Sequence, residues 1–550
     1  MQSEIEQQIL GPGGHFEIVE EPVLGVPLRV FRNRPRSARE LFEQIRGFGD
    51  DEYLVLGEQR ITFAEHYGRV AACAQAFRER YGLQPGDRVG IFGANTPEWL
   101  QAFWATVNAG GVAAAFNGWW TASEIEYGLQ LVKPKLLVGD RKRLARLEGD
   151  PGIPVLEFES DFPELFASHV GSSMPDVAIA EDDPAIILFT SGTTGFPKGA
   201  VLSHRAIVGF VQVPDAVKTL QLTAAGMDAS MLPRETLLVT TPFFHVSGVF
   251  AIGVLAMVNG SKCVLRAGAF DPEDALQLIE RERISGWAAL GSSGPLVARH
   301  PKLADYDTSS LTRISFGGAP TSPAIANEIR SAFPNAAQTM GTAYGLSESC
   351  ALGTMIGGAE YAQYPDSSGR AIPTVELDIR DEHGKSLPPG EKGEIYLRNP
   401  YVMLEYWANP EATRKTLTPD RWVATGDVGH VENGLLYVHS RERDLILRSA
   451  ENIYPAEIEN RLELHDEVAE AAVIGVDHDV HGQEVKAVVV RKPGSVLDEA
   501  GLGAWCRETL AGFKVPTLWE FRSEGLPRNA SGKVLKTVLS GEAAEPDPDE

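Results

Sequence analysis

The sequence predicts an α/β fold with a large N-terminal domain and a small C-terminal α+β domain. At 550 residues the chain is too long to fold around one hydrophobic core. Short apolar runs alternate with amphipathic segments until about residue 440, which is typical of strands joined by crossover helices. Because crossover connections join parallel strands, we expect stacked β-α-β layers with largely parallel sheets.

The first predicted layer begins with a strand at residues 88–93. Thr96 is a suitable helix N-cap and a proline follows it, so we predict a helix over residues 97–108. The apolar run at residues 112–116 is then the next strand. These three segments form one β-α-β unit.

The second layer repeats this plan with a strand at residues 237–241, a helix at 249–258 and a strand at 263–265. No charged side chain occurs between residues 236 and 261, so a membrane span is an alternative here. Pro242 and His245 interrupt the apolar run, and such residues are scarce in spans. We therefore expect a buried strand followed by a buried helix.

The pattern changes after residue 427. Residues 434–438 are typical of a hairpin strand, and the charged residues 440–444 of a solvated turn. Apolar runs at 458–464, 471–476 and 485–490 indicate the compact C-terminal domain.

We expect a large domain over residues 1–440 and a small domain over residues 441–540. The tail at 541–550 is acidic and proline-rich, so we expect it to be disordered. The glycine-rich residues 11–14 predict a flexible start.

Composition limits the function classes. A formal net charge of −25 argues against a nucleic-acid-binding protein, which needs a basic surface. The four cysteines lie far apart, without the paired spacing of zinc sites or disulfides. The first residues lack the basic and apolar regions of a signal peptide. A reduced, cytoplasmic setting without a transmembrane segment is therefore expected.

The most informative segment is Phe-Thr-Ser-Gly-Thr-Thr-Gly-Phe-Pro-Lys-Gly at residues 189–199. Its glycines let backbone N–H groups turn toward one point, and its hydroxyls and lysine add donors, which is how a loop binds polyphosphate. A P-loop is excluded because Pro197 stands at its second glycine and Gly199 at its metal-binding hydroxyl.

This run resembles the phosphate loop of the adenylate-forming superfamily, which contains acyl-CoA synthetases, adenylation domains and luciferases. Further motifs follow in the order of that family, and the resemblance covers about residues 50–540, nearly the whole chain. They are TPFFH at 241–245, GGAP at 317–320, YGLSE at 344–348, TGD at 425–427, SRERD at 440–444, ENIYP at 451–455, EIE at 457–459 and PRNASGK at 527–533.

The resemblance implies ATP, Mg²⁺ and coenzyme A as ligands, and it assigns roles to individual residues. The implied phosphate cradle is Thr190, Ser191, Gly192, Thr193, Thr194 and Lys198. The implied Mg²⁺ ligands are Glu348 and the hydroxyl of Thr190, and the implied adenine site is Gly318, Ala319, Pro320 and Tyr344. Ser347 is an implied nucleotide-binding residue, which keeps the hydroxyl of a position that is more often threonine in the family.

Asp427 and Arg441 are implied to bind the ribose, and Lys533 to reach the α-phosphate and the substrate carboxylate. His245 matches a family position near that carboxylate. Without this context, Arg441 and Lys533 would be assigned as solvated cations and Tyr344 as a core aromatic.

The implied reaction joins a carboxylic acid to AMP with release of pyrophosphate, and a thiol then displaces AMP. The family places a domain hinge at the position of Arg443. Many relatives carry two glycines where this chain has Ser449 and Ala450, in the segment that lines the thiol tunnel. This departure weakens the inference to coenzyme A.

The acid pocket is expected between residues 246–251, 290–295 and 341–343. These segments carry no cationic side chain, so we predict an apolar monocarboxylate, either fatty or ring-bearing, and a role in lipid metabolism. Two alternatives stay open, an acyl-AMP ligase that loads a carrier protein and a catalytically silent nucleotide-binding relative. A homodimer also stays open.

Overall fold

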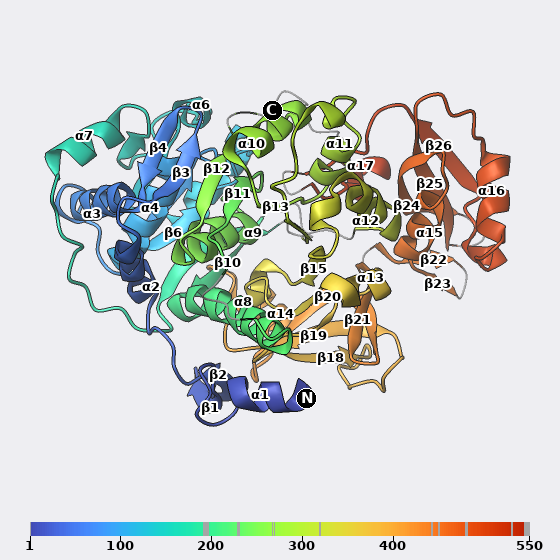
Figure 1. Ribbon diagram of the computed structural model, residues 1–550, viewed down its shortest axis with the longest axis horizontal. Coiled ribbons are helices and arrows are strands. Elements are labelled where there is room, and N and C mark those ends of the chain that lie inside the picture. Colours follow the sequence, from blue (N-terminus) through green and yellow to red (C-terminus); the bar gives the residue numbers. More distant parts are fainter. Residues whose placement is uncertain are drawn as a thin grey trace.

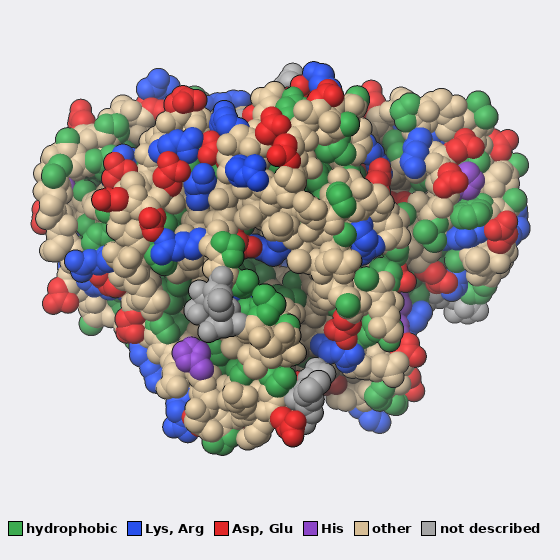
Figure 2. All heavy atoms as spheres, viewed as in Figure 1, with side chains coloured by type: hydrophobic (Ala, Val, Ile, Leu, Met, Phe, Trp, Pro, Cys, Tyr) green, Lys and Arg blue, Asp and Glu red, His purple; other side chains and the backbone are tan. Residues whose placement is uncertain are grey.

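The computed structural model describes residues 2–190, 197–227, 232–266, 268, 270–317, 321–441, 444–448, 451–478, 482–529 and 532–543. A large domain made of several sheets fills most of the molecule, and a small domain lies at one end (Figure 1). Acidic and basic side chains are interspersed on the face shown in Figure 2.

The first layer is a sheet with strand order β10-β9-β6-β5-β7-β8. Its strands run parallel except for β10, which is antiparallel to β9. The strands are β5 (Arg88–Phe92), β6 (Val112–Ala115), β7 (Leu136–Gly139), β8 (Val155–Glu157), β9 (Pro184–Thr190) and β10 (Lys198–Ser203). The helices in this part of the chain are α3 (Phe63–Glu79), α4 (Pro97–Asn108), α5 (Ala122–Val132), α6 (Arg141–Leu144) and α7 (Asp161–Ser168).

The second layer has strand order β17-β16-β15-β14-β13-β11-β12-β3-β4, parallel in its centre and antiparallel at both ends. The strands are β3 (Glu52–Leu56), β4 (Gln59–Thr62), β11 (Thr236–Val239), β12 (Lys262–Leu265), β13 (Gly286–Ala288), β14 (Arg313–Phe316), β15 (Gly341–Tyr344), β16 (Thr354–Gly357) and β17 (Arg370–Ala371). The helices are α8 (His204–Ala224), α9 (Val246–Gly248), α10 (Pro272–Glu282), α11 (Ser293–Ala298), α12 (Pro323–Ala332) and α13 (Gly358–Gln363).

An antiparallel sheet completes the large domain, and a mixed sheet forms the small one. The antiparallel sheet contains β18 (Glu376–Arg380), β19 (Gly393–Arg398), β20 (Trp422–Glu432) and β21 (Leu435–Arg441), with α14 (Pro410–Thr416) beside it. The small domain contains β22 (Ile446–Arg448), β23 (Glu451–Ile453), β24 (Val468–His478), β25 (Gly482–Arg491), β26 (Leu518–Arg522), α15 (Pro455–Glu463), α16 (Glu499–Arg507) and α17 (Lys536–Leu539).

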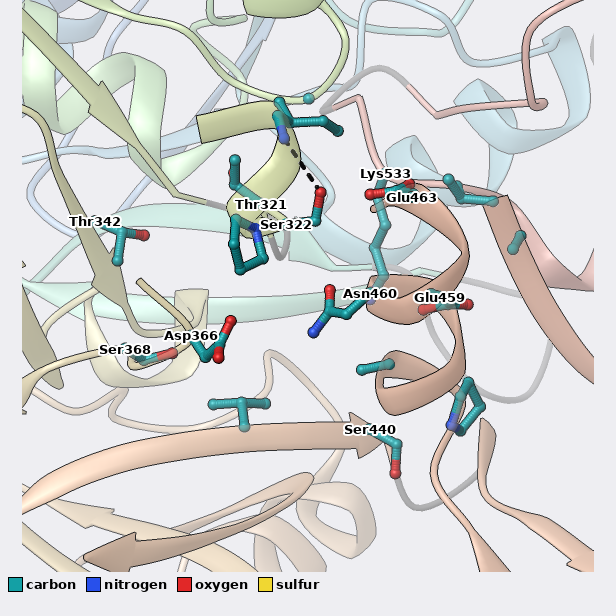
Figure 3. Close-up of a pocket in the computed structure, with 18 of the residues that line it drawn as sticks. Thr321, Ser322, Thr342, Asp366, Ser368, Ser440, Glu459, Asn460, Glu463 and Lys533 are labelled. Carbon is teal, nitrogen blue, oxygen red and sulfur yellow. Dashed lines mark hydrogen bonds between the residues drawn. The ribbon is translucent and has the colours of Figure 1, made fainter. Parts of the chain in front are cut away.

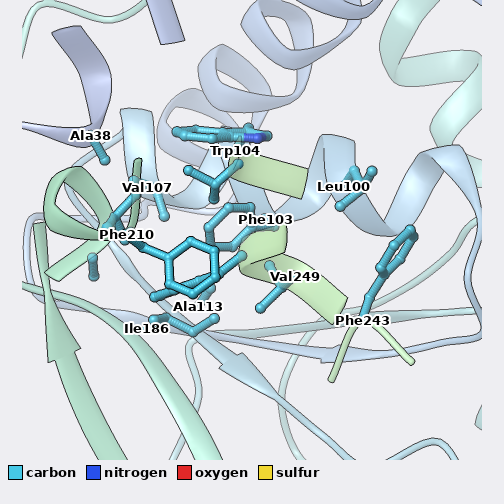
Figure 4. Close-up of a cluster of buried hydrophobic side chains, with 14 of the residues drawn as sticks. Ala38, Leu100, Phe103, Trp104, Val107, Ala113, Ile186, Phe210, Phe243 and Val249 are labelled. Carbon is cyan, nitrogen blue, oxygen red and sulfur yellow. The ribbon is translucent and has the colours of Figure 1, made fainter. Parts of the chain in front are cut away.

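The two predicted β-α-β layers are therefore confirmed, and the second differs from the prediction in its helix. Residues Val249–Ala256 form a π-helix, which leaves backbone groups out of the usual α-helical pattern. The indole N–H of Trp104 on α4 donates to the carbonyl of Gly253 at 2.8 Å. A β-carbon at Gly253 would lie 2.7 Å from Leu100, so α4 packs closely against this helix (Figure 4).

The N-terminus also differs from its prediction. Residues Gln2–Leu10 form α1, and the glycine-rich residues 11–14 form a turn in which the N–H of Gly11 donates to Gln7. A hairpin of β1 (Ile18–Val23) and β2 (Val26–Phe31) follows, and then α2 (Ala38–Gln44). Most of the predicted acidic tail, residues 544–550, lies outside the described residues.

Within the described part of the chain, no helix combines the length and the apolar character needed to cross a membrane. The uncharged segment at 236–261 instead forms β11, α9 and the π-helix. Most of their buried side chains belong to one hydrophobic core, and Leu238 of β11 belongs to another. Figure 4 shows the first of these cores where Phe243 and Val249 meet Leu100 and Phe103 of α4.

Candidate active site

A cavity of about 310 Å³ lies between the large and small domains. Residues from β15, β20, β21 and the segment before α11 line its large-domain wall. Side chains of α15, together with Arg528 and Lys533, line the opposite wall (Figure 3). Four of the residues predicted from the sequence meet here, namely Tyr344, Asp427, Arg441 and Lys533.

Tyr344, Asp427 and Arg441 form a connected group on the large-domain side. The hydroxyl of Tyr344 donates to Oδ2 of Asp427 at 2.8 Å, and Nε of Arg441 lies 3.4 Å from Oδ1. Asp427 and Arg441 are register partners on β20 and β21, so the sheet holds them together. Burial raises the pKa of Tyr344, which therefore remains a neutral hydrogen-bond donor.

The residues that flank the phosphate loop are also neighbours. Thr190 ends β9, Lys198 begins β10, and the two are register partners in the antiparallel pair. The hairpin therefore returns the lysine beside the threonine. Ser191, Gly192, Thr193 and Thr194 lie outside the described residues, as do Gly318, Ala319 and Pro320.

Glu348 lies in a short helical turn that begins at Ser347, and only 7% of the residue is exposed. The hydroxyl of Tyr406 donates to its Oε1 at 2.6 Å. Among the described residues, Oε2 accepts no hydrogen bond, so a hard oxygen donor is left for a cation. The site therefore fits a Mg²⁺ ion that also binds ATP, and no described cluster of three or more potential ligands would hold a metal without the nucleotide.

Tyr406 was not identified by the sequence analysis. It lies 58 residues from Glu348, and no spacing rule connects the two. The ammonium of Lys198 lies 5.2 Å from the centre of the Tyr406 ring. Tyr406 thus contacts both a predicted phosphate ligand and the predicted metal ligand.

Lys533 is carried by a turn of the small domain. Its backbone N–H donates to Oδ1 of Asn529 at 2.9 Å, and Arg528 donates to the carbonyl of Gly532 at 2.7 Å. Arg528 also pairs with Glu470 on β24 at 3.0 Å. The turn is thereby tied to the sheet, and the Lys533 side chain runs beside α15 into the cavity (Figure 3).

Gly291 and Gly532 form a close backbone contact between the domains. A β-carbon on Gly532 would lie 2.8 Å from Cα of Gly291, and both glycines have positive φ angles, 60° and 78°. Residues 290–295 were expected to line the acid pocket. The structure places Gly291, Ser292 and Pro295 in the wall of the interdomain cavity.

His245 lies outside this cavity wall, between the two layers. It precedes α9, and its ring centre is 4.7 Å from that of Phe244. Its Nε2 is buried without a hydrogen-bond partner in the part of the chain that the structure describes. Burial lowers the pKa of His245 to about 4, so the imidazole is neutral at pH 7.

Asn95 holds the segment before His245 and was also missed. Its amide Nδ2 donates to the carbonyl of Thr241 at 2.8 Å, and its Oδ1 accepts the N–H of Phe243 at 2.9 Å. Asn95 follows β5 as His245 follows β11, so both lie beyond the carboxyl ends of parallel strands, where ligand sites of such sheets are found. The position of Asn95 directly after a predicted strand could therefore have identified it as a candidate site residue.

Arg443, Ser449 and Ala450 lie outside the described residues, so the predicted hinge and the departure in the thiol tunnel stay predictions. The same applies to the role of each site residue and to the domain boundaries at residues 440 and 540.

Comparisons with known proteins agree with this geometry. The family model of AMP-binding enzymes matches residues 41–407, and that of the AMP-binding enzyme C-terminal domain matches residues 457–533. A feruloyl-CoA synthase from an Amycolatopsis species is 34% identical over 483 residues, which are 87% of this chain and 93% of that protein.

Two further relatives extend the likeness. A 3-[(3aS,4S,7aS)-7a-methyl-1,5-dioxo-octahydro-1H-inden-4-yl]propanoyl:CoA ligase of Rhodococcus jostii is 33% identical over 534 residues, 92% of this chain and 97% of that protein. The ATP-bound structure of MatB from Rhodopseudomonas palustris superimposes with a TM-score of 0.80 at 29% identity, covering 92% of this chain and 99% of that one. The chain belongs to the AMP-binding enzyme family and is an adenylate-forming, AMP-releasing enzyme of the acid–CoA ligase type.

Proposed function

We propose that the protein activates an apolar monocarboxylic acid, fatty or ring-bearing, as an acyl-adenylate and transfers the acyl group to coenzyme A. The observation that carries the proposal is the meeting of Tyr344, Asp427 and Arg441 with Lys533 of the other domain on one cavity. The ribose hydroxyls of a nucleoside need hydrogen-bond acceptors, and a reacting phosphate needs a cation nearby. Asp427 and Lys533 offer these two groups in this cavity.

In the first half-reaction, a carboxylate oxygen of the acid attacks the α-phosphorus of ATP, and the bond to pyrophosphate breaks. Asp427 accepts hydrogen bonds from the ribose hydroxyls, while Arg441 holds the Asp427 carboxylate in place. Lys533 lies where its ammonium can stabilise the charge that builds on the α-phosphate. A Mg²⁺ ion bound through Glu348 would neutralise part of the phosphate charge.

In the second half-reaction, the thiolate of coenzyme A attacks the acyl carbonyl, and AMP leaves as the C–O bond of the mixed anhydride breaks. Lys533 has no part in this step, so the small domain is free to turn away. The contact between Gly291 and Gly532 would then open. The rotation belongs to the proposal, with a hinge near residue 443.

The apolar acid is supported by the surroundings of His245. Its neighbours Phe243 and Phe244 are buried, and the imidazole is neutral at pH 7. A neutral ring can donate one hydrogen bond to the acid carboxylate without holding a second charge. Two of the relatives are named for ring-bearing acyl groups, a feruloyl group and a methyl-dioxo-octahydroindenyl propanoyl group.

A pyrophosphate-release screen tests the proposal. Purified protein with MgATP is offered acetate, fatty acids of increasing length, cinnamic-type acids, fused-ring propanoic acids and amino acids. We expect release with the fatty or ring-bearing acids. A preference for acetate or an amino acid would overturn the substrate class, and no release with any acid would overturn adenylation itself.

The acceptor is tested with the best acid from that screen. Free coenzyme A is compared with a phosphopantetheinylated carrier protein, and acyl-thioester products are measured by mass spectrometry. We expect acyl-CoA. Thioester on the carrier protein alone would favour the acyl-AMP ligase, the alternative that Ser449 and Ala450 keep open.

A further inference from the structure

Tyr406 contacts two side chains from distant parts of the chain, Glu348 and Lys198, which the proposed adenylation chemistry uses together. Its hydroxyl donates to Oε1 of Glu348 at 2.6 Å, and the Lys198 ammonium lies 5.2 Å from its ring centre. Tyr406 is only 5% exposed and is therefore shielded from water. In such a buried environment a hydrogen bond to a carboxylate is stronger than at the surface.

The backbone of Tyr406 is fixed to the strand that carries Lys198. The N–H of Leu404 donates to Val201 at 2.8 Å, and the N–H of Trp407 donates to Gly199 at 2.7 Å. Tyr406 itself forms an antiparallel β-bridge with Ala200. The segment therefore extends the first sheet beyond β10, directly beside the end of the phosphate loop.

The other side of Tyr406 is held by α14. Its N–H donates to Oγ1 of Thr413 at 2.9 Å, and Thr413 Oγ1 in turn donates to the carbonyl of Asn409 at 2.8 Å. The hydroxyl cannot leave Glu348 by a small shift of the backbone, because both the sheet and the helix would have to move. The direction of Oε1 is therefore set by the fold.

We propose that Tyr406 is a positioning residue for nucleotide binding, which turns Oε2 of Glu348 toward the metal of MgATP and keeps Lys198 beside the phosphates. The inference rests on the proposed function for the role of MgATP. One oxygen of the carboxylate is occupied by the phenol, so the other is left as the ligand. The aromatic ring restricts the lysine by a cation–π contact.

The decisive variant is Tyr406→Phe, which keeps the ring and removes the hydroxyl. ATP binding is measured by calorimetry on the full chain, once with Mg²⁺ and once with EDTA. Losing a hydrogen bond to a buried carboxylate should weaken MgATP binding about tenfold and leave metal-free ATP binding unchanged. The Mg²⁺ concentration for half-maximal pyrophosphate release should rise by a similar factor, about tenfold.

Tyr401→Phe is the matched control, because Tyr401 is a buried tyrosine of the same segment that packs against Gly209 of α8. It should leave the effect of Mg²⁺ on ATP binding unchanged. A double-variant cycle with Glu348→Gln then identifies the route of action. If Tyr406 acts through Glu348, Tyr406→Phe should have no further effect on the Mg²⁺ dependence of that variant.

The proposal is overturned if Tyr406→Phe weakens ATP binding equally with and without Mg²⁺, or if Tyr401→Phe reduces the Mg²⁺ dependence of ATP binding as much as Tyr406→Phe does. It is also overturned if the effects of Tyr406→Phe and Glu348→Gln on this Mg²⁺ dependence are additive. Should Tyr406→Phe unfold the protein, Thr413→Val loosens the same tyrosine from α14 and is expected to cause a smaller loss of Mg²⁺ dependence. The binding assay needs no acid, so failure of the substrate screen and failure of this inference give different results.

Discussion

The two domains contribute differently to the cavity between them. The large domain supplies Tyr344 from β15, and Asp427 and Arg441 from the paired strands β20 and β21, so hydrogen-bonded sheets set their positions. The small domain supplies Lys533 from a turn that meets the large domain through Gly532 and Gly291. The proposed nucleoside site is thus built from strands of one domain, whereas the position of Lys533 depends on how the domains are arranged.

This comparison predicts that Lys533→Ala separates the two half-reactions. Adenylation should fall by about 10²–10³-fold, because one positioned cation is lost from the transition state. Acyl-CoA formation from pre-made acyl-adenylate should be retained. Both rates are measured separately, by pyrophosphate release and by thioester formation.

Lys536→Ala is the control for charge and location, since Lys536 contacts Val473 and Glu459 within the small domain. It should leave adenylation nearly unchanged. Equal loss of both half-reactions in Lys533→Ala would contradict the division between the domains.

Asp427→Asn should instead impair both half-reactions. In the proposed function the large domain binds the nucleoside of both ATP and the acyl-adenylate. Removing the charge of Asp427 would weaken the hydrogen bonds to the ribose and the pair with Arg441. We expect roughly a 10–100-fold loss in kcat/KM for ATP and for the acyl-adenylate. Asp378→Asn, on the same sheet and paired with Arg380, is the control. A defect confined to one half-reaction would contradict this prediction.

Gly532→Ala tests the contact between the domains. The new methyl group would lie 2.8 Å from Cα of Gly291, so the small domain cannot seat as it does here. We expect adenylation to fall roughly fivefold to tenfold, while thioester formation from acyl-adenylate is spared.

Gly494→Ala is the control, because it also places alanine at a positive φ and so causes a similar backbone strain. Its φ of 82° is similar, but no atom lies within 4 Å of the added carbon. Both variants should lose similar thermal stability, and only Gly532→Ala should slow adenylation. Equal adenylation rates in the two variants would show that the contact has no role in the reaction.

Glu463 on α15 predicts a smaller, pH-dependent effect. Burial raises its pKa to about 7, and it contacts Ser322 of the large domain and the N–H of Ala471. Glu459 and Glu470 lie nearby and favour the protonated form, while Arg299 favours the charged form. In the arrangement of the domains seen here, Glu463 therefore keeps a proton that an exposed glutamate releases near pH 4.5. The stability of this arrangement falls as pH rises from 4.5 through about 7.

Linkage with a pKa of about 7 when Glu463 is buried and 4.5 when it is exposed amounts to about tenfold from pH 6 to pH 8, so adenylation should fall by at most about tenfold over this range through this group. Glu463→Gln stays neutral and should flatten that part of the profile. The rates are measured by pyrophosphate release at constant ionic strength. If the pH profile of pyrophosphate release is the same in Glu463→Gln, Glu463 is not the group responsible for it.

Much of the architecture was predictable from local patterns. The strand at residues 88–93, the helix at 97–108 with its proline in the first turn and the strand at 112–116 all form close to the predicted bounds. The helix at 249–258 was predicted without its type, and the structure shows a π-helix over Val249–Ala256. Its sequence is uniformly apolar, so nothing in it distinguishes a π-helix from an α-helix that packs on Leu100 and Trp104.

The sequence by itself determined the family, the two layers and the residue types of the site, because ordered motifs and hydrophobic periodicity are local properties. Only the tertiary structure decided that Tyr406 holds Glu348 and that Gly532 meets Gly291. The first pair is separated by 58 residues and the second joins two domains, so neither contact has a local signature. Both arise from the packing of distant segments, which fixes distances that residue spacing does not.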